Sequence, residues 1–233
     1  KLKGNENTTD MKISSFLARR GVRKFFEAER KEAIEAVAVG LSLPFYPEGD
    51  REFFKKIENV QFIKSFSSGF KSHYFNKFGA PRINNLIWKV DNNIEIAYFD
   101  FKIYTGGHEG TDSCFYSVAY FSSKQIDSPQ FRIRETNFIE RAINIFRPTV
   151  NFNKIHHEFH KKYFVTGKDE STIKSLLNVG FLEHITRYRP PEMSEISASE
   201  DHITFKALEI EPDHIENFVD ENMKLMMLLW PIK

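Results

Sequence analysis

The segment His156–His160 reads HHEFH and combines the residue types that bind zinc and transfer protons in hydrolases. The zinc-protease motif places two residues between the glutamate and the second histidine, so that both imidazoles face the metal. Here one residue separates Glu158 from His160, and that spacing is absent. If this stretch were helical, His156 and His160 could still chelate a metal. The interpretation that we favour is a polar loop leading into a strand at Tyr163, and we predict no metal site.

Asp100 is a carboxylate inside an apolar strand sequence, a setting in which general acids and bases are found. No second acid stands at an obvious partner position in the sequence. The interpretation we favour is a buried, hydrogen-bonded aspartate. The alternative is a hydrolase-like enzyme whose site is assembled from distant residues around Asp100 and His156–His160.

Three further motifs are better explained as structure than as chemistry. Gly106–Thr111 is glycine-rich but lacks the Gly-Lys-Ser/Thr ending of a phosphate loop and precedes a strand, which predicts a hairpin loop. Cys114, the single cysteine, has no adjacent histidine to activate it and excludes an internal disulfide. Aromatic residues alternate with lysines over Phe62–Phe78, as in single-strand nucleic-acid sites, but a chain with 24 phenylalanines favours core. We predict no catalytic residue and no cofactor.

The composition is that of a folded protein with a sizeable core, since 41% of the 233 residues are apolar and 28% are charged. A formal net charge of +1 provides no overall field for nucleic acid, so we expect no nucleic-acid partner. The longest uncharged run, Ala36–Pro47, has twelve residues, whereas a membrane-spanning helix needs about 20.

The hydrophobic periodicity defines the elements that must position these residues. Period-2 segments between turn residues predict strands at Leu86–Val90, Ile94–Tyr104, Cys114–Phe121, Gln130–Arg134 and Lys162–Thr166, and a hairpin across Ser197–Asp201. Apolar stripes predict helices over Ala33–Leu41, Asp50–Ile57, after an Asp169 cap, and from Pro212. The fold class is therefore α+β, a mainly antiparallel sheet covered by a few helices, with an N-terminal basic helical extension.

We divide the chain into a flexible tail with a basic helical extension, residues 1–29, and a single α+β domain, residues 30–233. Met11–Lys31 holds seven basic residues against two glutamates, interleaved with apolar residues. Such a pattern is typical of membrane-surface or partner-docking segments. The alternative is a helix packed on its own domain. The predicted docking set consists of Lys12, Arg19, Arg20, Arg23 and Lys24.

Several segments in fixed order resemble a family of uncharacterised bacterial proteins whose members often carry N-terminal transmembrane helices. The segments are Gly40-Leu41, Tyr98–Gly107, Pro129–Thr136, Asn151-Phe152 and Phe159–Gly167. The resemblance implies an architecture, and it implies that the basic stretch lies where a membrane anchor joins the domain. It implies no catalytic residue.

Together these observations favour a non-enzymatic interaction or scaffold domain that associates with a membrane through its N-terminal side. The expected partners are another protein, a second copy of the chain, or an anionic membrane surface. The expected location is cytoplasmic, including the cytoplasmic face of a membrane, because basic residues beside a bilayer mark that side.

Overall fold

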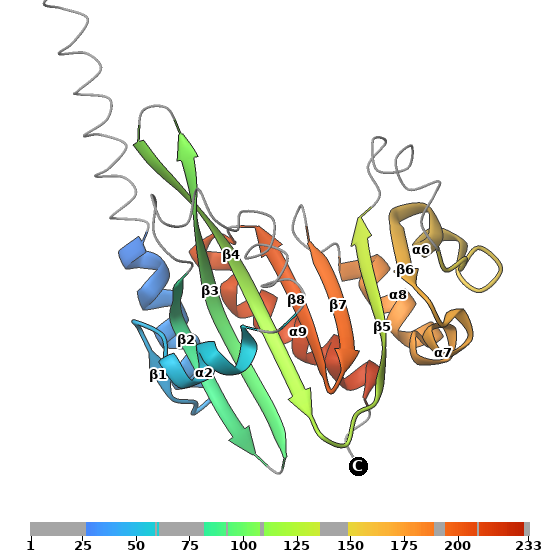
Figure 1. Cartoon of the computed structure of the whole chain (residues 1–233), viewed down its shortest axis with the longest axis horizontal. Helices are drawn as coiled ribbons and strands as arrows, with labels where there is room; N and C mark the ends of the chain where they lie inside the picture. The colour runs from blue at the N-terminus through green and yellow to red at the C-terminus, as the bar shows by residue number, and fades with distance from the viewer. Residues whose placement is uncertain are drawn as a thin grey trace, which may run out of the picture.

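The computed structural model describes residues 27–58, 60, 82–91, 93–107, 110–135, 149–188, 194–208 and 210–230. These residues form one eight-stranded sheet in the order β1-β2-β3-β4-β8-β7-β5-β6, with every neighbouring pair antiparallel (Figure 1). The strands are β1 (Phe45–Tyr46), β2 (Arg82–Asp91), β3 (Ile94–Gly107), β4 (Gly110–Ser123), β5 (Ser128–Glu135), β6 (Tyr163–Gly167), β7 (Glu195–Glu200) and β8 (His202–Leu208).

Helices cover both faces of this sheet. One helix spans residues 27–40, and α2 (Arg51–Ile57) follows it. The later helices are α6 (His157–Lys162), α7 (Glu170–Leu176), α8 (Val179–Tyr188), the short 3-10 helix η2 (Pro212–His214) and α9 (Ile215–Leu229). Within the described part of the chain, no helix combines the length and apolar character needed to cross a bilayer.

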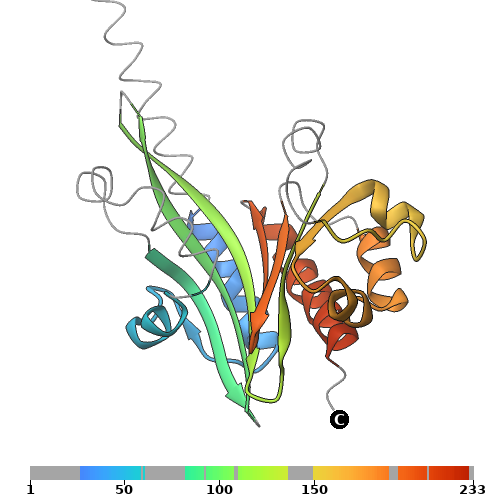
Figure 2. The same ribbon diagram turned by 45° about the vertical axis from the view of Figure 1, so that its right-hand side comes forward.

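The long strand β3 is buried on both faces because its apolar residues do not alternate with polar ones. Ile96 and Tyr98 face the larger core, which is covered by the helix 27–40, α9 and α6–α8. Ala97, Phe99 and Phe101 face a smaller core, which is covered by α2. Figure 2 shows α2 on one side of the sheet, with the helix 27–40 and α9 on the other.

The predicted fold class and strands are confirmed, as are the predicted helices. Asp50 caps α2 by accepting from the Phe53 N–H at 2.8 Å, and Asp169 caps α7 by accepting from the Thr172 N–H at 3.0 Å. Gly106–Thr111 spans the connection between the paired strands β3 and β4, as a hairpin requires. The sequence did not predict α8, which follows α7 after two residues.

The prediction of a loop at His156–His160 is wrong, because these residues begin and form α6. The His156 ring accepts a hydrogen bond from the Phe159 N–H at 3.1 Å and so acts as the N-cap, an unusual role for histidine. Phe159 is fully buried between the rings of Phe152 and Tyr163, at centroid distances of 5.4 and 5.1 Å. This aromatic packing holds the short helix in place.

Some predictions fall outside the described residues. They are the tail and the docking set, from residue 1 to residue 26, and the segment Phe62–Phe78. The side chain of Cys114 is also outside them, although its backbone pairs with that of Ile103.

Candidate functional site

Strand alternation on β2 and β3 builds the floor of a cavity of about 590 Å³. Alternate residues on one strand face the same side of a sheet, so Ile87, Lys89 and Asp91 of β2 share a face. The register places them opposite Tyr98, Ile96 and Ile94 of β3, respectively. This floor of three cross-strand pairs faces the larger core.

Helix α9 forms one wall of this cavity. Val219, Met223, Met226 and Met227 stand at helical positions i, i+4, i+7 and i+8, which lie on one face. Leu41 and Leu43, just after the helix 27–40, form the opposite wall. The volume is about 590 Å³, and nine of its thirteen lining residues are aliphatic or methionine. We call this cavity the methionine pocket.

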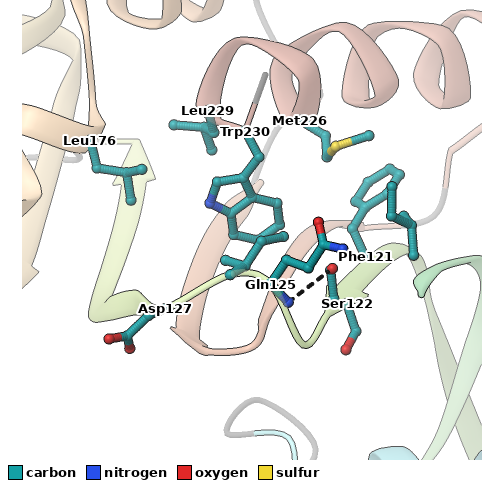
Figure 3. Close-up of a pocket in the computed structure, with 11 residues that line it drawn as sticks. Phe121, Ser122, Gln125, Asp127, Leu176, Met226, Leu229 and Trp230 are labelled. Atoms are coloured by element: carbon teal, nitrogen blue, oxygen red, sulfur yellow. Dashed lines mark hydrogen bonds between the residues drawn. The ribbon is translucent and has the colours of Figure 1, made fainter. Parts of the chain in front are cut away.

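A second cavity of about 410 Å³ lies beside the first, at the C-terminal end of α9. Trp230 and Leu229 line it from that end, Leu176 from α7, and Gln125 and Asp127 from the turn between β4 and β5. In Figure 3 the Trp230 side chain points from the helix end toward the turn that carries Gln125. The Gln125 N–H donates to Ser123 Oγ at 3.2 Å and fixes this turn. We call this cavity the tryptophan pocket.

Ile94, Gln125 and Met226 line both pockets, so these three residues form the boundary between them. Gln125 and Met226 have unbranched side chains with several rotatable bonds, and methionine adapts readily to the shape of its surroundings. The boundary therefore consists largely of groups that can move aside without displacing the backbone.

A buried ion pair lies beside the methionine pocket. Arg30, from the helix 27–40, donates to both carboxylate oxygens of Asp100, from Nε at 2.7 Å and from Nη2 at 2.6 Å. The two side chains are 1% and 0% exposed. Asn85 donates to Asp100 Oδ2 at 2.9 Å, from the irregular part of β2 where its φ is 51°. Asp100 is thus buried and hydrogen-bonded, as expected.

Further hydrogen bonds join Arg30 to the rest of the larger core. Nη2 donates to Ser117 Oγ at 2.5 Å and to the Tyr98 hydroxyl at 3.4 Å, and Nη1 donates to the Ile210 carbonyl. Burial raises the pKa of Tyr98 well above its ordinary value, and the nearby Asp100 carboxylate raises it further. Because Tyr98 also lines the methionine pocket, one neutral phenol connects the ion pair to that pocket.

A second charged cluster surrounds Glu195, which is 5% exposed. The carboxylate pairs with Arg132 at 3.4 Å, Arg134 at 2.5 Å and Lys206 at 3.8 Å. Burial lowers the pKa of Lys206, and Glu195 opposes that effect. The cluster joins β5, β7 and β8, which explains its place in the sheet without a ligand.

The structure does not bring Asp100 and His156–His160 together. Asp100 lies on β3, whereas α6 runs directly into β6 at the sheet edge. Five strand spacings of about 4.8 Å separate the two strands, roughly 24 Å. No group of three or more potential metal ligands occurs among the described residues. The hydrolase alternative based on these residues therefore has no assembled site.

The sequence analysis missed the partner of Asp100 and both pockets. Arg30 was interpreted as one of the basic residues of Met11–Lys31, but it is a core residue four positions before the buried Ile34. That i, i+4 spacing was the available signal, since Arg30 extends the apolar stripe by one turn. The apolar stripe of the last helix, which includes Val219 and Met226, was predicted from its periodicity, but the incomplete cover of the helix was not.

Comparisons with known proteins add a resemblance in fold. No protein-family model matches the chain, and no curated protein matches it by sequence. Among solved structures, the chain is similar to the crystal structure of the mycobacterial trehalose monomycolate transport factor A, TtfA. The TM-score is 0.48 at 6% identity, over 88% of this chain and 98% of that one. At that level the similarity has no bearing on function.

Proposed function

We propose that the chain is a non-enzymatic binding module that holds an apolar ligand in the methionine pocket. The observation that carries the proposal is the lining, in which three methionines and six aliphatic residues surround a cavity of about 590 Å³. Sites for small molecules are concave, mostly apolar and of about 300–1,000 Å³. Two lining residues, Leu41 and Met227, are 43% and 52% exposed, so the apolar lining continues to the surface.

The polar residues of the pocket suit binding better than catalysis. Lys89 and Asp91 pair with each other at 3.2 Å near the surface, with 46% and 60% of their side chains exposed. The Tyr98 hydroxyl is engaged by Arg30, and its raised pKa keeps it neutral. Among these three described lining residues, no nucleophile is hydrogen-bonded to a general base that would activate it.

Calorimetric titration with octanol, decanol and dodecanol tests this proposal. We expect saturable binding that tightens about fourfold for each methylene buried. Met223→Trp fills the pocket and should abolish the binding. Val39→Trp places the same indole on an exposed position outside the pocket lining and should leave the binding intact. Absence of binding by the parent protein, or equal loss in both variants, would contradict the proposal.

We also propose that the docking set holds the module on an anionic membrane surface. Its support is the sequence of Met11–Lys31, in which basic and apolar residues are interleaved and whose last five residues belong to the helix 27–40. Each basic residue near such a surface contributes about 1 kcal/mol, and salt screens this attraction. The helix 27–40 is about 20 Å long and ends beside the pocket wall at Leu41.

Co-sedimentation with vesicles of phosphatidylserine and phosphatidylcholine tests the membrane proposal. We expect binding that weakens as salt is added and is lost when all five residues of the docking set are changed to glutamine. The matched control changes five exposed basic residues spread over the domain, and it should retain binding. Failure of the parent protein to bind at low salt would refute the membrane form of the proposal. The control residues are Lys55, Lys124, Lys154, Lys168 and Arg187.

A further inference from the structure

We infer that the ligand is a single-chain amphiphile with an uncharged, hydroxyl-bearing head, its chain in the methionine pocket and its head in the tryptophan pocket. This inference rests on the proposed function, because it assigns the apolar part of the ligand to the same cavity. It adds the second cavity, the orientation of the ligand and the chemistry of the head.

The two pockets differ in the kind of polar group they offer. The tryptophan pocket has the Ser123 hydroxyl, the Gln125 amide and the Asp127 carboxylate among its eleven lining residues. Hydroxyls and amides both donate to and accept from alcohol groups, and an ionised carboxylate accepts from them. The indole of Trp230 supplies a flat apolar surface beside them. This combination suits a small polyol head with polar edges and apolar C–H faces.

The charges at the tryptophan pocket disfavour an anionic head. Asp127 is the one ionisable side chain among the described residues that line it. A carboxylate or phosphate head would lie beside this like charge, whereas a neutral hydroxyl can donate a hydrogen bond to it. The nearest cation in the linings, Lys89, belongs to the other pocket and is paired with Asp91.

A chain can pass from one pocket to the other at their shared boundary. Met226 and Gln125 stand there, and both have flexible side chains. Met226 packs on the larger core from α9, whereas Gln125 lies in an exposed turn. The amide of Gln125 is therefore placed where the head of the ligand joins the chain.

Trp230 allows the orientation to be measured directly. We would titrate the protein with monoacylglycerols that carry bromine either next to the head or at the end of the chain, because bromine quenches only nearby indoles. The other tryptophan, Trp88, packs on Phe53 in the smaller core, so it serves as an internal reference. We expect strong quenching by the head-proximal bromine and weak quenching by the terminal one. Trp230→Phe should remove the difference.

Head chemistry is tested with monodecanoylglycerol and decanoate, which share one chain. We expect monodecanoylglycerol to bind more tightly. Asp127→Asn should strengthen decanoate binding about two- to fivefold, the effect of removing one exposed like charge. Asp213→Asn, on the exposed helix η2, is the matched control and should change neither affinity.

The outcomes separate this inference from the proposed function. Binding of both ligands with equal affinity, or stronger quenching by the terminal bromine, overturns the inference and leaves an apolar site in the methionine pocket. Binding of neither ligand, together with failure of the alcohol titration, overturns both. Tighter binding of the glycerol ester with head-proximal quenching supports the inference.

Discussion

Removing either member of the Arg30–Asp100 pair should destabilise the domain strongly. Both side chains are almost completely buried, so Arg30→Met leaves the Asp100 carboxylate without its cation, and Asp100→Leu leaves the guanidinium without its anion. Loss of one partner from a buried pair costs about 3–5 kcal/mol. Since domains of this kind are stable by about 5–15 kcal/mol, either change removes a large share of the total.

Urea denaturation followed by circular dichroism measures this effect. With an m-value of about 2–3 kcal/mol/M, each single variant should lower the midpoint by about 1–2 M. The double variant Arg30→Met/Asp100→Leu buries no unpaired charge, so we expect it to be no less stable than either single variant. Arg51→Met, at an exposed position on α2, serves as the control and should change stability by less than about 0.5 kcal/mol.

Two results would refute this reasoning. One is a single variant within about 1 kcal/mol of the parent, which would mean that water or a neighbouring group replaces the missing charge. The other is a double variant whose loss equals the sum of the single losses, because additivity means that the two residues do not interact.

Three further predictions concern stability. Burial raises the pKa of Tyr98 and Tyr163 above the ordinary value of 10.0, so their hydroxyls ionise at lower pH in the unfolded state than in the folded state. The free energy of unfolding should therefore fall as the pH rises above that value. Urea midpoints measured across alkaline pH test this, and a constant midpoint would count against it. Gly49 has a φ of 72°, and a Cβ there would collide with the Ile83 carbonyl. Gly49→Ala should therefore lower the melting temperature, while Gly40→Ala, with open space around it, should not. Phe99→Ala should cost about 3–5 kcal/mol, and a near-parental melting temperature would contradict its core position.

The elements with strong periodicity were predictable from the sequence, and the contacts between distant segments were not. Strand β3 was recognisable from Ile94–Tyr104 because its residue types and turn boundaries act locally. Arg30 and Asp100 are 70 positions apart, and nothing local indicates that they meet. The helix at His157 was missed because its cap is a histidine and its packing depends on Phe152. The two pockets arise from how α9 sits over the sheet, which periodicity does not encode.

The position of the β7–β8 hairpin has a consequence for how the chain reaches its folded state. In the described sheet, β8 pairs with β4 and β7 pairs with β5, so this late hairpin joins two blocks of strands that precede it in the chain. On a ribosome, β1 to β6 would emerge before the strands that unite them. The Ile210 carbonyl, which accepts from Arg30 across 180 positions, emerges later still. Such long-range closure slows folding. Chains that end before Glu195 should therefore expose two unfinished sheet edges and be the ones that aggregate or require a chaperone.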